Sequence, residues 1–239
     1  LYDEPHFLLQ QEVSEVGSYF SIIKAIAAGN HKLSTIAAVL EVKSTNLTKY
    51  LKTLMDLDIL ERRVPVTEGN PEKSKRGLYK IKDNYLRFWF AFIYPNMSFI
   101  ESGHSGIVMD KIRKGLTTSH IGFVYEDICE ERMWELNVNN TWPFQFSKLG
   151  GYWDAKNEID IAALDPEGKN LILGECKYWK EPVGLNVLHA LETKACDVAW
   201  ERDRRKVWYV LFSISGFSDE LRNHAATRDD LLLIDDGER

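Results

Sequence analysis

Two strand-like segments joined by a turn constrain this chain more than any other feature of its sequence. Residues 157–164 mix acidic and apolar side chains, and residues 171–177 form a nearly continuous apolar run that ends with Glu175 and Lys177. Asp165-Pro166-Glu167-Gly168 between them has the composition of a turn. The segment therefore predicts a β-hairpin whose second strand is covered on both faces, where charged side chains need a reason to be present.

The turn also predicts the register of the hairpin. If Asp165 pairs with Gly168, Asp160 lies opposite Leu173 and diagonal to Glu175. Because side chains alternate between the faces of a strand, the charged ones should share one face: Glu158, Asp160, Glu175 and Lys177. The other face should carry the apolar ones: Ile159, Ile161, Ile172 and Cys176.

The paired carboxylates predict a site for Mg²⁺ or Mn²⁺. Diagonal neighbours across a strand pair lie about 7–8 Å apart at the backbone, which two carboxylates can span by holding one cation. Mg²⁺ binds few protein carboxylates, keeps several waters and takes further oxygen ligands from phosphate groups. We therefore expect Asp160 and Glu175 to hold the metal, helped by the backbone carbonyl of Cys176, while Lys177 positions the water that attacks a phosphodiester.

A solvated strand face is the alternative interpretation of the same residues. Lys177 would then form an ordinary surface ion pair, worth about 0–1 kcal/mol. We favour a functional origin for Asp160, Glu175 and Lys177 because the second strand is so apolar, and we expect Glu158 to be a bystander. Lys194, on the following helix, could approach the site, but we expect it to be solvated.

Composition narrows the class of protein. A chain of 239 residues is long enough for two domains. Its three cysteines lack CxxC spacing, which disfavours disulfides and zinc ribbons and indicates a reducing cytoplasm. We find no segment of roughly 18 apolar residues that could span a membrane. The first residue is Leu1, which fits a piece of a longer protein.

The N-terminal third predicts a winged helix-turn-helix. A helix over residues 18–28 should end at Gly29-Asn30, and Ser34 and Ser44 should cap two further helices. Residues 59–66 and 76–81 then alternate as two strands around a polar loop. The helix from Ser44 has apolar residues at helical spacing, which should face inward: Leu47, Tyr50, Leu51, Leu54 and Leu57.

Polar and basic residues of this region are the candidates for DNA contact. The net charge of -6 argues superficially against nucleic acid, but residues 43–87 contain eleven Lys or Arg against six Asp or Glu. Groove contacts are expected from the outer face of the third helix, at Ser44, Asn46, Lys49 and Lys52. Phosphate contacts are expected around the wing, at Arg62, Arg63, Lys73, Lys75 and Arg76. The alternative is a helix-turn-helix that docks proteins instead of DNA.

Periodicity extends the prediction to the rest of the chain. Residues 85–95 are aromatic at helical spacing, which favours core packing over a platform for stacking bases. Helices are expected at residues 122–131 and 183–200, and strands at residues 206–214 and 231–234. The apolar side of the helix at 122–131 should hold Ile121, Val124, Tyr125 and Ile128. The predicted order after residue 120 is α-β-β-β-α-β-α-β.

The trio Asp160, Glu175 and Lys177 resembles the motif of the PD-(D/E)XK nucleases, the restriction-endonuclease-like superfamily. That resemblance implies that an Asp and a Glu-x-Lys on adjacent strands carry the chemistry. It also implies an acid on the preceding helix. Glu126 fits best by its aromatic-Glu spelling, with Glu130 as the alternative, and it would orient the site or a second metal.

The two modules together resemble the C-terminal region of a family of archaeal and bacterial P-loop ATPases, a region labelled a domain of unknown function. Leu8 to Val13 resembles the exit from the ATPase, and residues 85–92 the aromatic signature. The resemblance implies an N-terminal ATPase domain in the full-length protein. This chain has no Gly-x-x-x-x-Gly-Lys-Ser/Thr loop and therefore no ATP site of that kind.

The sequence thus predicts a mixed α/β fold of two domains, a winged helix with an aromatic linker helix over residues 1–95 and a nuclease-like domain over residues 96–239. The predicted function is a Mg²⁺-dependent DNA endonuclease that prefers duplex DNA to single strands. The alternative is a non-catalytic regulatory module that binds DNA or protein through a degenerate nuclease fold. We expect no membrane association, and a homo-oligomer is compatible with either interpretation.

Overall fold

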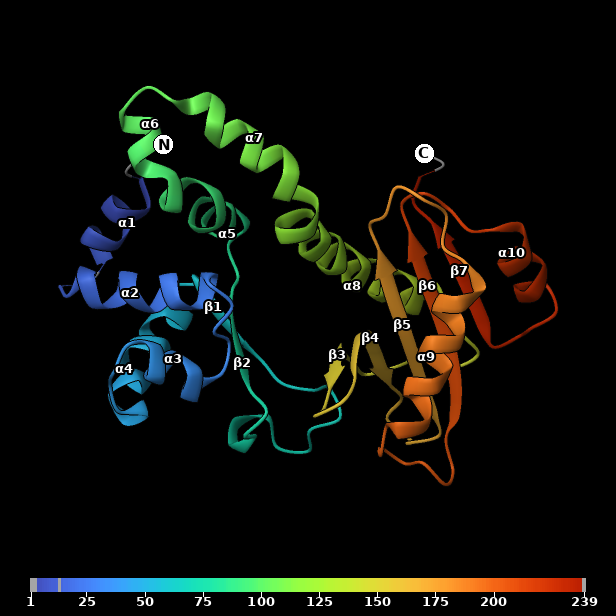
Figure 1. Ribbon diagram of the computed structural model, residues 1–239. Coiled ribbons are helices and arrows are strands. Elements are labelled where there is room, and N and C mark those ends of the chain that lie inside the picture. Colours follow the sequence, from blue (N-terminus) through green and yellow to red (C-terminus); the bar gives the residue numbers. More distant parts are fainter. Residues whose placement is uncertain (1–3, 13, 238–239) are drawn as a thin grey trace. The chain divides into compact units, whose positions relative to one another are not determined.

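The computed structural model describes residues 4–12 and 14–237 and confirms the mixed α/β fold class (Figure 1). The chain divides into two compact units, residues 1–64 with 71–120, and residues 65–70 with 121–239. Val13, the last residue of the segment that resembles an ATPase exit, lies outside the described residues.

The first unit contains helices and a two-stranded hairpin. Its elements in chain order are α1 (Glu4–Glu12), α2 (Val16–Ala27), α3 (Leu33–Val39), α4 (Ser44–Asp56), β1 (Leu60–Arg63), η1 (Pro71–Lys73), β2 (Leu78–Ile81), α5 (Asn84–Phe88), η2 (Trp89–Ile93), η3 (Tyr94–Asn96), α6 (Met97–Glu101), α7 (Ser105–Leu116) and η4 (Thr117–Ile121). Strands β1 and β2 pair antiparallel, from Leu60 opposite Ile81 to Arg63 opposite Leu78. Helices α2 to α4 followed by this hairpin have the order expected of a winged helix.

Helix ends in this unit follow the prediction only in part. Gly29 adopts a φ of +92° just after α2, as expected for a residue that ends a helix in the left-handed region. The predicted caps Ser34 and Ser44 are wrong, because α3 and α4 begin earlier and place Lys32 and Lys43 at the N-cap positions without side-chain hydrogen bonds. Ser44 is instead the first residue of α4.

Apolar packing organises the first unit. Leu47, Leu51 and Leu54 on α4 are buried as predicted, in a core that includes Ile22 of α2. The aromatic segment also lies in this core, because Trp89 and other rings of the π-helical η2 are buried. Core packing rather than an open stacking platform is therefore confirmed for this segment.

The second unit is a five-stranded mixed sheet with helices on both faces. Its elements are α8 (Gly122–Val138), β3 (Lys148–Trp153), β4 (Glu158–Leu164), β5 (Asn170–Lys177), α9 (Leu185–Asp197), β6 (Lys206–Ser213), α10 (Asp219–Ala225) and β7 (Leu231–Asp235). The predicted order α-β-β-β-α-β-α-β is confirmed. Within the sheet the strands lie in the order β3-β4-β5-β6-β7, antiparallel from β3 to β5 and parallel from β5 to β7.

Strand β5 is the centre of this sheet and is covered on both sides. Leu171 and Leu173 pack in a cluster with the buried residues of α9 and α10, whereas Ile172 and Cys176 pack in a second cluster with α8. Both faces of β5 are therefore buried, as its long apolar run predicted. On α8, Ile128 was predicted to be inside but is exposed, because α8 buries Cys129 and Met133 instead.

The predicted register of the β4–β5 hairpin is wrong by two residues. Ala162, not Asp160, lies opposite Leu173, and Leu164 lies opposite Leu171. Asp165 causes the longer loop, because its carboxylate accepts hydrogen bonds from the Lys169 amide at 2.9 Å and from the Asn170 side chain at 2.7 Å. A shift of two residues by itself moves no side chain to the other face of its strand.

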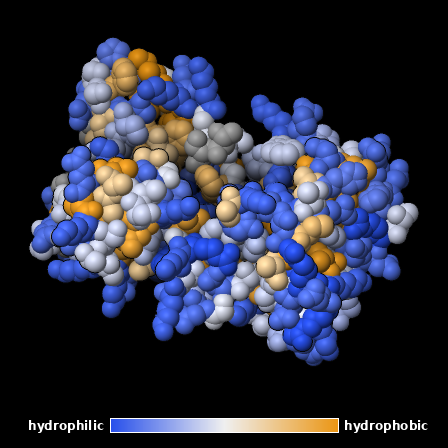
Figure 2. All heavy atoms as spheres, turned by 60° about the horizontal axis from the view of Figure 1, so that its bottom comes forward, coloured by the Kyte–Doolittle hydropathy of each residue, from blue (hydrophilic) through white to orange (hydrophobic). Residues whose placement is uncertain are grey.

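The surface is largely hydrophilic in the view of Figure 2, with apolar side chains in separate patches. Within residues 4–12 and 14–237, no helix combines the length and apolarity that a membrane span requires. The three cysteines are free thiols, with Cys129 and Cys176 buried and Cys196 exposed.

Candidate functional site

The three predicted nuclease residues come together at the end of β5. The Lys177 ammonium lies 2.5 Å from the Glu175 carboxylate and 3.2 Å from the Asp160 carboxylate. These side chains are mostly covered, with exposed fractions of 7% for Glu175 and 17% for each of the other two. The structure thus brings two acids and one ammonium into a single, partly buried cluster.

A β-bulge positions Asp160 in this cluster. Gly150 lies opposite Ala162, and Tyr152 lies opposite Ile159, so that two residues of β4 face the single residue Gly151 of β3. The bulge corrects one prediction, because Ile159 packs in the cluster with α9 while Ile161 packs on the α8 side. Bulges bend a strand and re-aim its side chains, and this one lies at the predicted metal ligand.

The Asp160 carboxylate also accepts a backbone hydrogen bond from β5, just beyond the last backbone pair of β4 and β5. The β4–β5 pairing runs from Leu164 opposite Leu171 to Ile161 opposite Gly174. Beyond it, the backbone amide of Cys176 donates a 2.9 Å hydrogen bond to the Asp160 side chain. A short side chain bound to the neighbouring backbone has little freedom, so Asp160 is held in place beside Glu175.

Lys194 is a fourth member of the cluster that the sequence interpretation set aside as solvated. It extends from α9, and its ammonium lies 2.6 Å from the Glu175 carboxylate and 2.7 Å from the Glu158 carbonyl oxygen. Both carboxylate oxygens of Glu175 therefore bind an ammonium, one from Lys177 and one from Lys194. The Glu158 side chain itself is exposed.

The cluster keeps Lys177 positively charged. Burial by itself lowers the pKa of Lys177, but the negative charges of Asp160 and Glu175 outweigh burial and raise that pKa above its ordinary value. Lys177 is therefore an ammonium at neutral pH. It can donate hydrogen bonds and offset negative charge, whereas it has no free electron pair with which to accept a proton.

The predicted helical acid lies on the other side of β5. Glu126 is half-buried on α8, and Glu130 follows one turn later. Burial, then the Cys129 thiol and the charges of Asp160 and Glu126, raise the pKa of the Cys176 thiol. Glu126 and Asp160 therefore act electrostatically on the same residue, and Cys176 stays a protonated thiol on the α8 side.

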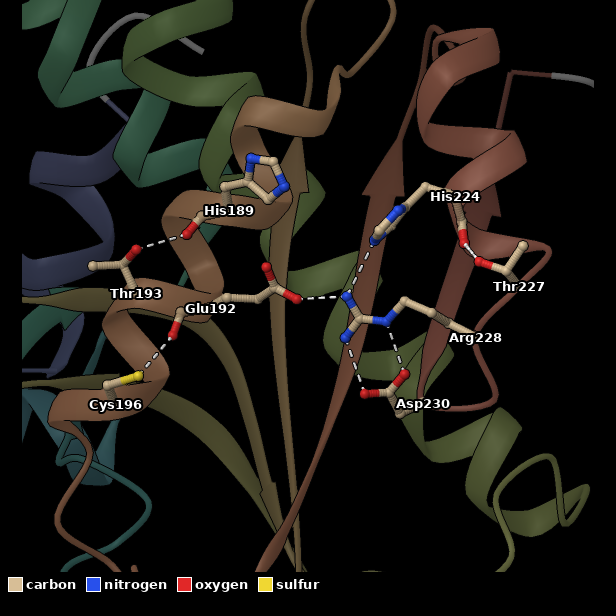
Figure 3. Close-up of polar contacts among 8 residues, drawn as sticks. All are labelled: His189, Glu192, Thr193, Cys196, His224, Thr227, Arg228 and Asp230. Carbon is tan, nitrogen blue, oxygen red and sulfur yellow. Dashed lines mark hydrogen bonds and ion pairs between the residues drawn. The ribbon is translucent and has the colours of Figure 1, made fainter.

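Helix α9, which carries Lys194, is tied to the segment before β7 by an arginine (Figure 3). Arg228 binds both oxygens of Asp230 at 2.9 Å and reaches Glu192 of α9 at 2.5 Å. Hydrogen bonds from Arg228 lower the pKa of Asp230. The bidentate pair with Asp230 orients the guanidinium, and the contact with Glu192 links this segment to α9, the helix from which Lys194 extends.

The predicted DNA-contacting residues of the first unit fall into two groups. Arg62 donates to the carbonyl oxygens of Pro71 at 2.8 Å and Ser74 at 2.6 Å, so that it braces the wing loop, and Arg63 pairs with Glu61 at 2.6 Å. Ser44 is half-buried at the start of α4. The remaining candidates are exposed: Asn46, Lys49, Lys52, Lys73, Lys75 and Arg76.

The donor set at the cluster fits a hard cation that keeps much of its hydration shell. Asp160 and Glu175 supply two carboxylates, and nowhere in the described part of the chain do three or more His, Cys, Asp or Glu side chains gather as a metal-binding group. A two-carboxylate site suits Mg²⁺ or Mn²⁺ better than Zn²⁺, which takes three or four protein ligands.

Comparison with known proteins finds a family model that matches part of this chain. Residues 89–195 match the DUF234 family. The family is described as archaea bacterial proteins of unknown function, and its matched segment contains Glu126, Asp160, Glu175, Lys177 and Lys194. The exposed DNA candidates of the first unit precede the DUF234 segment.

Two further proteins are similar to this chain. An uncharacterized protein of Methanocaldococcus jannaschii is 41% identical over 178 residues, which are 74% of this chain and 39% of that protein. The chain therefore spans well under half of that relative's length. A crystal structure of a repair endonuclease from Pyrococcus abyssi is similar to part of this chain. The superposition covers 45% of this chain and 45% of the endonuclease chain, with a TM-score of 0.28 and 10% sequence identity.

Proposed function

We propose that this chain is the DNA-cleaving part of a Mg²⁺- or Mn²⁺-dependent endonuclease. The observation that carries the proposal is the cluster at the end of β5, where Lys177 lies within hydrogen-bond distance of both Asp160 and Glu175. Two acids from neighbouring strands with an ammonium beside them match the PD-(D/E)XK arrangement. The strand order of the second unit, with an α-β-β-β-α-β-α-β succession, supports the same proposal.

Each residue of the cluster has a role in this proposal. Asp160 and Glu175 would hold the metal, together with the Cys176 carbonyl, and a bound metal supplies an activated water and stabilises charge on the phosphate. Lys177 would orient the attacking water and offset charge on phosphate oxygens. Lys194 positions Glu175, and the negative charge of Glu126 acts on Cys176 from the α8 side.

DNA recruitment is assigned to the first unit. Exposed Lys49 and Lys52 lie on α4, the third helix of the winged-helix arrangement, and exposed Lys73, Lys75 and Arg76 lie on or beside the wing. Cations in both places would bind phosphates of a duplex segment. The proposal also retains an N-terminal ATPase domain in the full-length protein, for which the greater length of the archaeal relative leaves room.

The test of cleavage is nicking of supercoiled plasmid by the purified protein in Mg²⁺ or Mn²⁺. EDTA should abolish nicking, and the decisive variant is Lys177→Ala. An absence of nicking under all metal conditions would contradict the proposed activity.

The salt dependence of DNA binding tests the role of α4. Replacing Lys49 and Lys52 together with alanine should reduce the slope of log affinity against log salt by about 1 for each lost phosphate contact. The measurement is fluorescence anisotropy with a labelled duplex at several salt concentrations. A double variant of exposed lysines in the second unit, Lys148→Ala with Lys156→Ala, controls for the change in net charge. An unchanged slope in the α4 variant would remove this helix from the interface.

One observation favours a second candidate, a DNA- or protein-binding module without turnover. Both oxygens of Glu175 already bind lysine ammonium groups, so the charges of the cluster are balanced without a metal. In such a module DNA binding would have no cation requirement. Direct titration with Mn²⁺ separates the two candidates, because only the nuclease needs a cation at Asp160 and Glu175.

A further inference from the structure

Trp179 is an exposed aromatic side chain beside the proposed catalytic cluster. Its exposed fraction is 48%, whereas Trp89, Trp142 and Trp208 are buried in the cores of the two units. The Lys177 ammonium lies 5.8 Å from the centre of the Trp179 ring, within the range of a cation–π contact. One face of a large aromatic ring is thus placed next to the ammonium that the proposed mechanism uses at a phosphate.

The backbone that carries this ring is held in place. The Trp179 carbonyl oxygen accepts a 2.5 Å hydrogen bond from the Ser215 hydroxyl. Further along, the Val183 amide donates to the Gly216 carbonyl oxygen at 2.9 Å, and Val183 forms a parallel bridge with Phe217. The loop after β5 is therefore fastened to the loop after β6 at Trp179 and again at Val183. An exposed aromatic side chain on a fixed backbone loses little freedom when it binds a flat ligand.

We infer that Trp179 stacks on an unpaired nucleobase next to the phosphate that Lys177 contacts, an inference that rests on the proposed nuclease function. Sites for single-stranded nucleic acid combine cations along the backbone with aromatic rings under the bases. Inside a duplex the bases cover one another's faces, so that away from the duplex ends an indole ring gains a stacking partner only where a base is unpaired. The substrate class is accordingly DNA with a single-stranded segment at the cluster, such as a fork, whose duplex part the winged helix holds.

The test is DNA binding without turnover, measured in EDTA by fluorescence anisotropy. Forked, single-stranded and blunt duplex oligonucleotides are compared for the parent protein, Trp179→Ala and Trp179→Phe. Trp179→Ala should bind the fork and the single strand about tenfold more weakly, an effect within the range of base–aromatic stacking. Its affinity for the blunt duplex should be unchanged, and Trp179→Phe should keep most of the affinity for the fork. Trp134→Ala, which removes a similarly exposed indole on α8, should bind all three like the parent.

An abasic scan of the single-stranded arm identifies the stacked base. One abasic position should weaken parent binding as much as Trp179→Ala does, and combining the two changes should cost no more than either alone. The inference is overturned if Trp179→Ala binds the fork like the parent, if it loses the same affinity for the blunt duplex, or if the parent binds no forked DNA. If only the nuclease proposal fails, the protein should still bind DNA through Trp179 and the stacked base but should show no metal-dependent cleavage.

Discussion

Replacing Lys177 with alanine is expected to slow plasmid nicking at least about a hundredfold in saturating Mg²⁺ or Mn²⁺, which is the lower range for positioned acid-base groups. The physical reason is the geometry of the ammonium, 3.2 Å from Asp160 and 2.5 Å from Glu175. Its removal takes away both the donor that orients water and the positive charge next to the phosphate. Initial rates of conversion from supercoiled to nicked plasmid provide the measurement.

Two further variants make the Lys177 result interpretable. Lys177→Met keeps the apolar stem of the side chain and separates lost chemistry from lost packing, so it should be as inactive as Lys177→Ala. Lys169→Ala removes an exposed lysine from the hairpin turn, where it pairs with Glu167, and should nick at the parental rate. A Lys177→Ala protein that is folded and nicks as fast as the parent would exclude the catalytic role.

The largest effect on stability is expected from Gly174→Ala. A Cβ atom at Gly174 would lie 2.5 Å from Val210 Cγ1 and 2.9 Å from the Val210 carbonyl oxygen of the neighbouring strand β6. The carbonyl oxygen cannot retreat without separating β6 from β5, the central strand of the sheet. We expect the free energy of unfolding of the second unit to fall by about 3 kcal/mol, the upper end of the usual cost of overpacking.

Urea unfolding followed by tryptophan fluorescence measures this change, since Trp208 lies on β6. Gly150→Ala on β3 is the matched control, because its Cβ would meet nothing closer than Val66 Cβ at 3.8 Å. The control should unfold within about 0.5 kcal/mol of the parent, as harmless substitutions do. Equal stability of the Gly174 and Gly150 variants would show that β5 and β6 are not packed as closely as described.

The sequence predicted the hairpin strands well because their signals are local. Strand β4 was expected from residue 157 and begins at Glu158, and β5 was expected from residue 171 and begins at Asn170. The register was wrong because side-chain hydrogen bonds of Asp165 close a longer loop than the turn composition indicated. A shift of two residues still let Asp160, Glu175 and Lys177 meet, so the predicted cluster could form, whereas Ile159 lies on the face opposite to its prediction.

Other features of the site depend on tertiary structure and have weaker signals. The bulge opposite Gly151 is a backbone irregularity, and no side-chain pattern in β4 marked it. The position of Lys194 was, by contrast, predictable from helical spacing. It lies three residues after Leu191 and seven after Val187, on the buried side of α9. A lysine on an apolar helical stripe indicates a buried partner, which here is Glu175.

Helix α8 shows a different limit of the periodic signal. Apolar residues occur on several sides of this helix, with Tyr125 and Cys129 buried and Ile128 exposed. Hydrophobic periodicity identifies the buried face only when the opposite face is polar. The sequence therefore predicted that α8 exists but assigned one of its core positions incorrectly.

Calorimetric titration with Mn²⁺ of the parent protein, Asp160→Ala and Glu158→Ala tests directly whether Asp160 and Glu175 hold a cation. We predict that the parent binds Mn²⁺ and that Asp160→Ala does not, because one of the two carboxylates of the site is gone. Glu158→Ala removes a nearby exposed acid outside the cluster and should bind like the parent. Mn²⁺ binding that survives in Asp160→Ala, or that is absent from the parent, would contradict a cation held between Asp160 and Glu175.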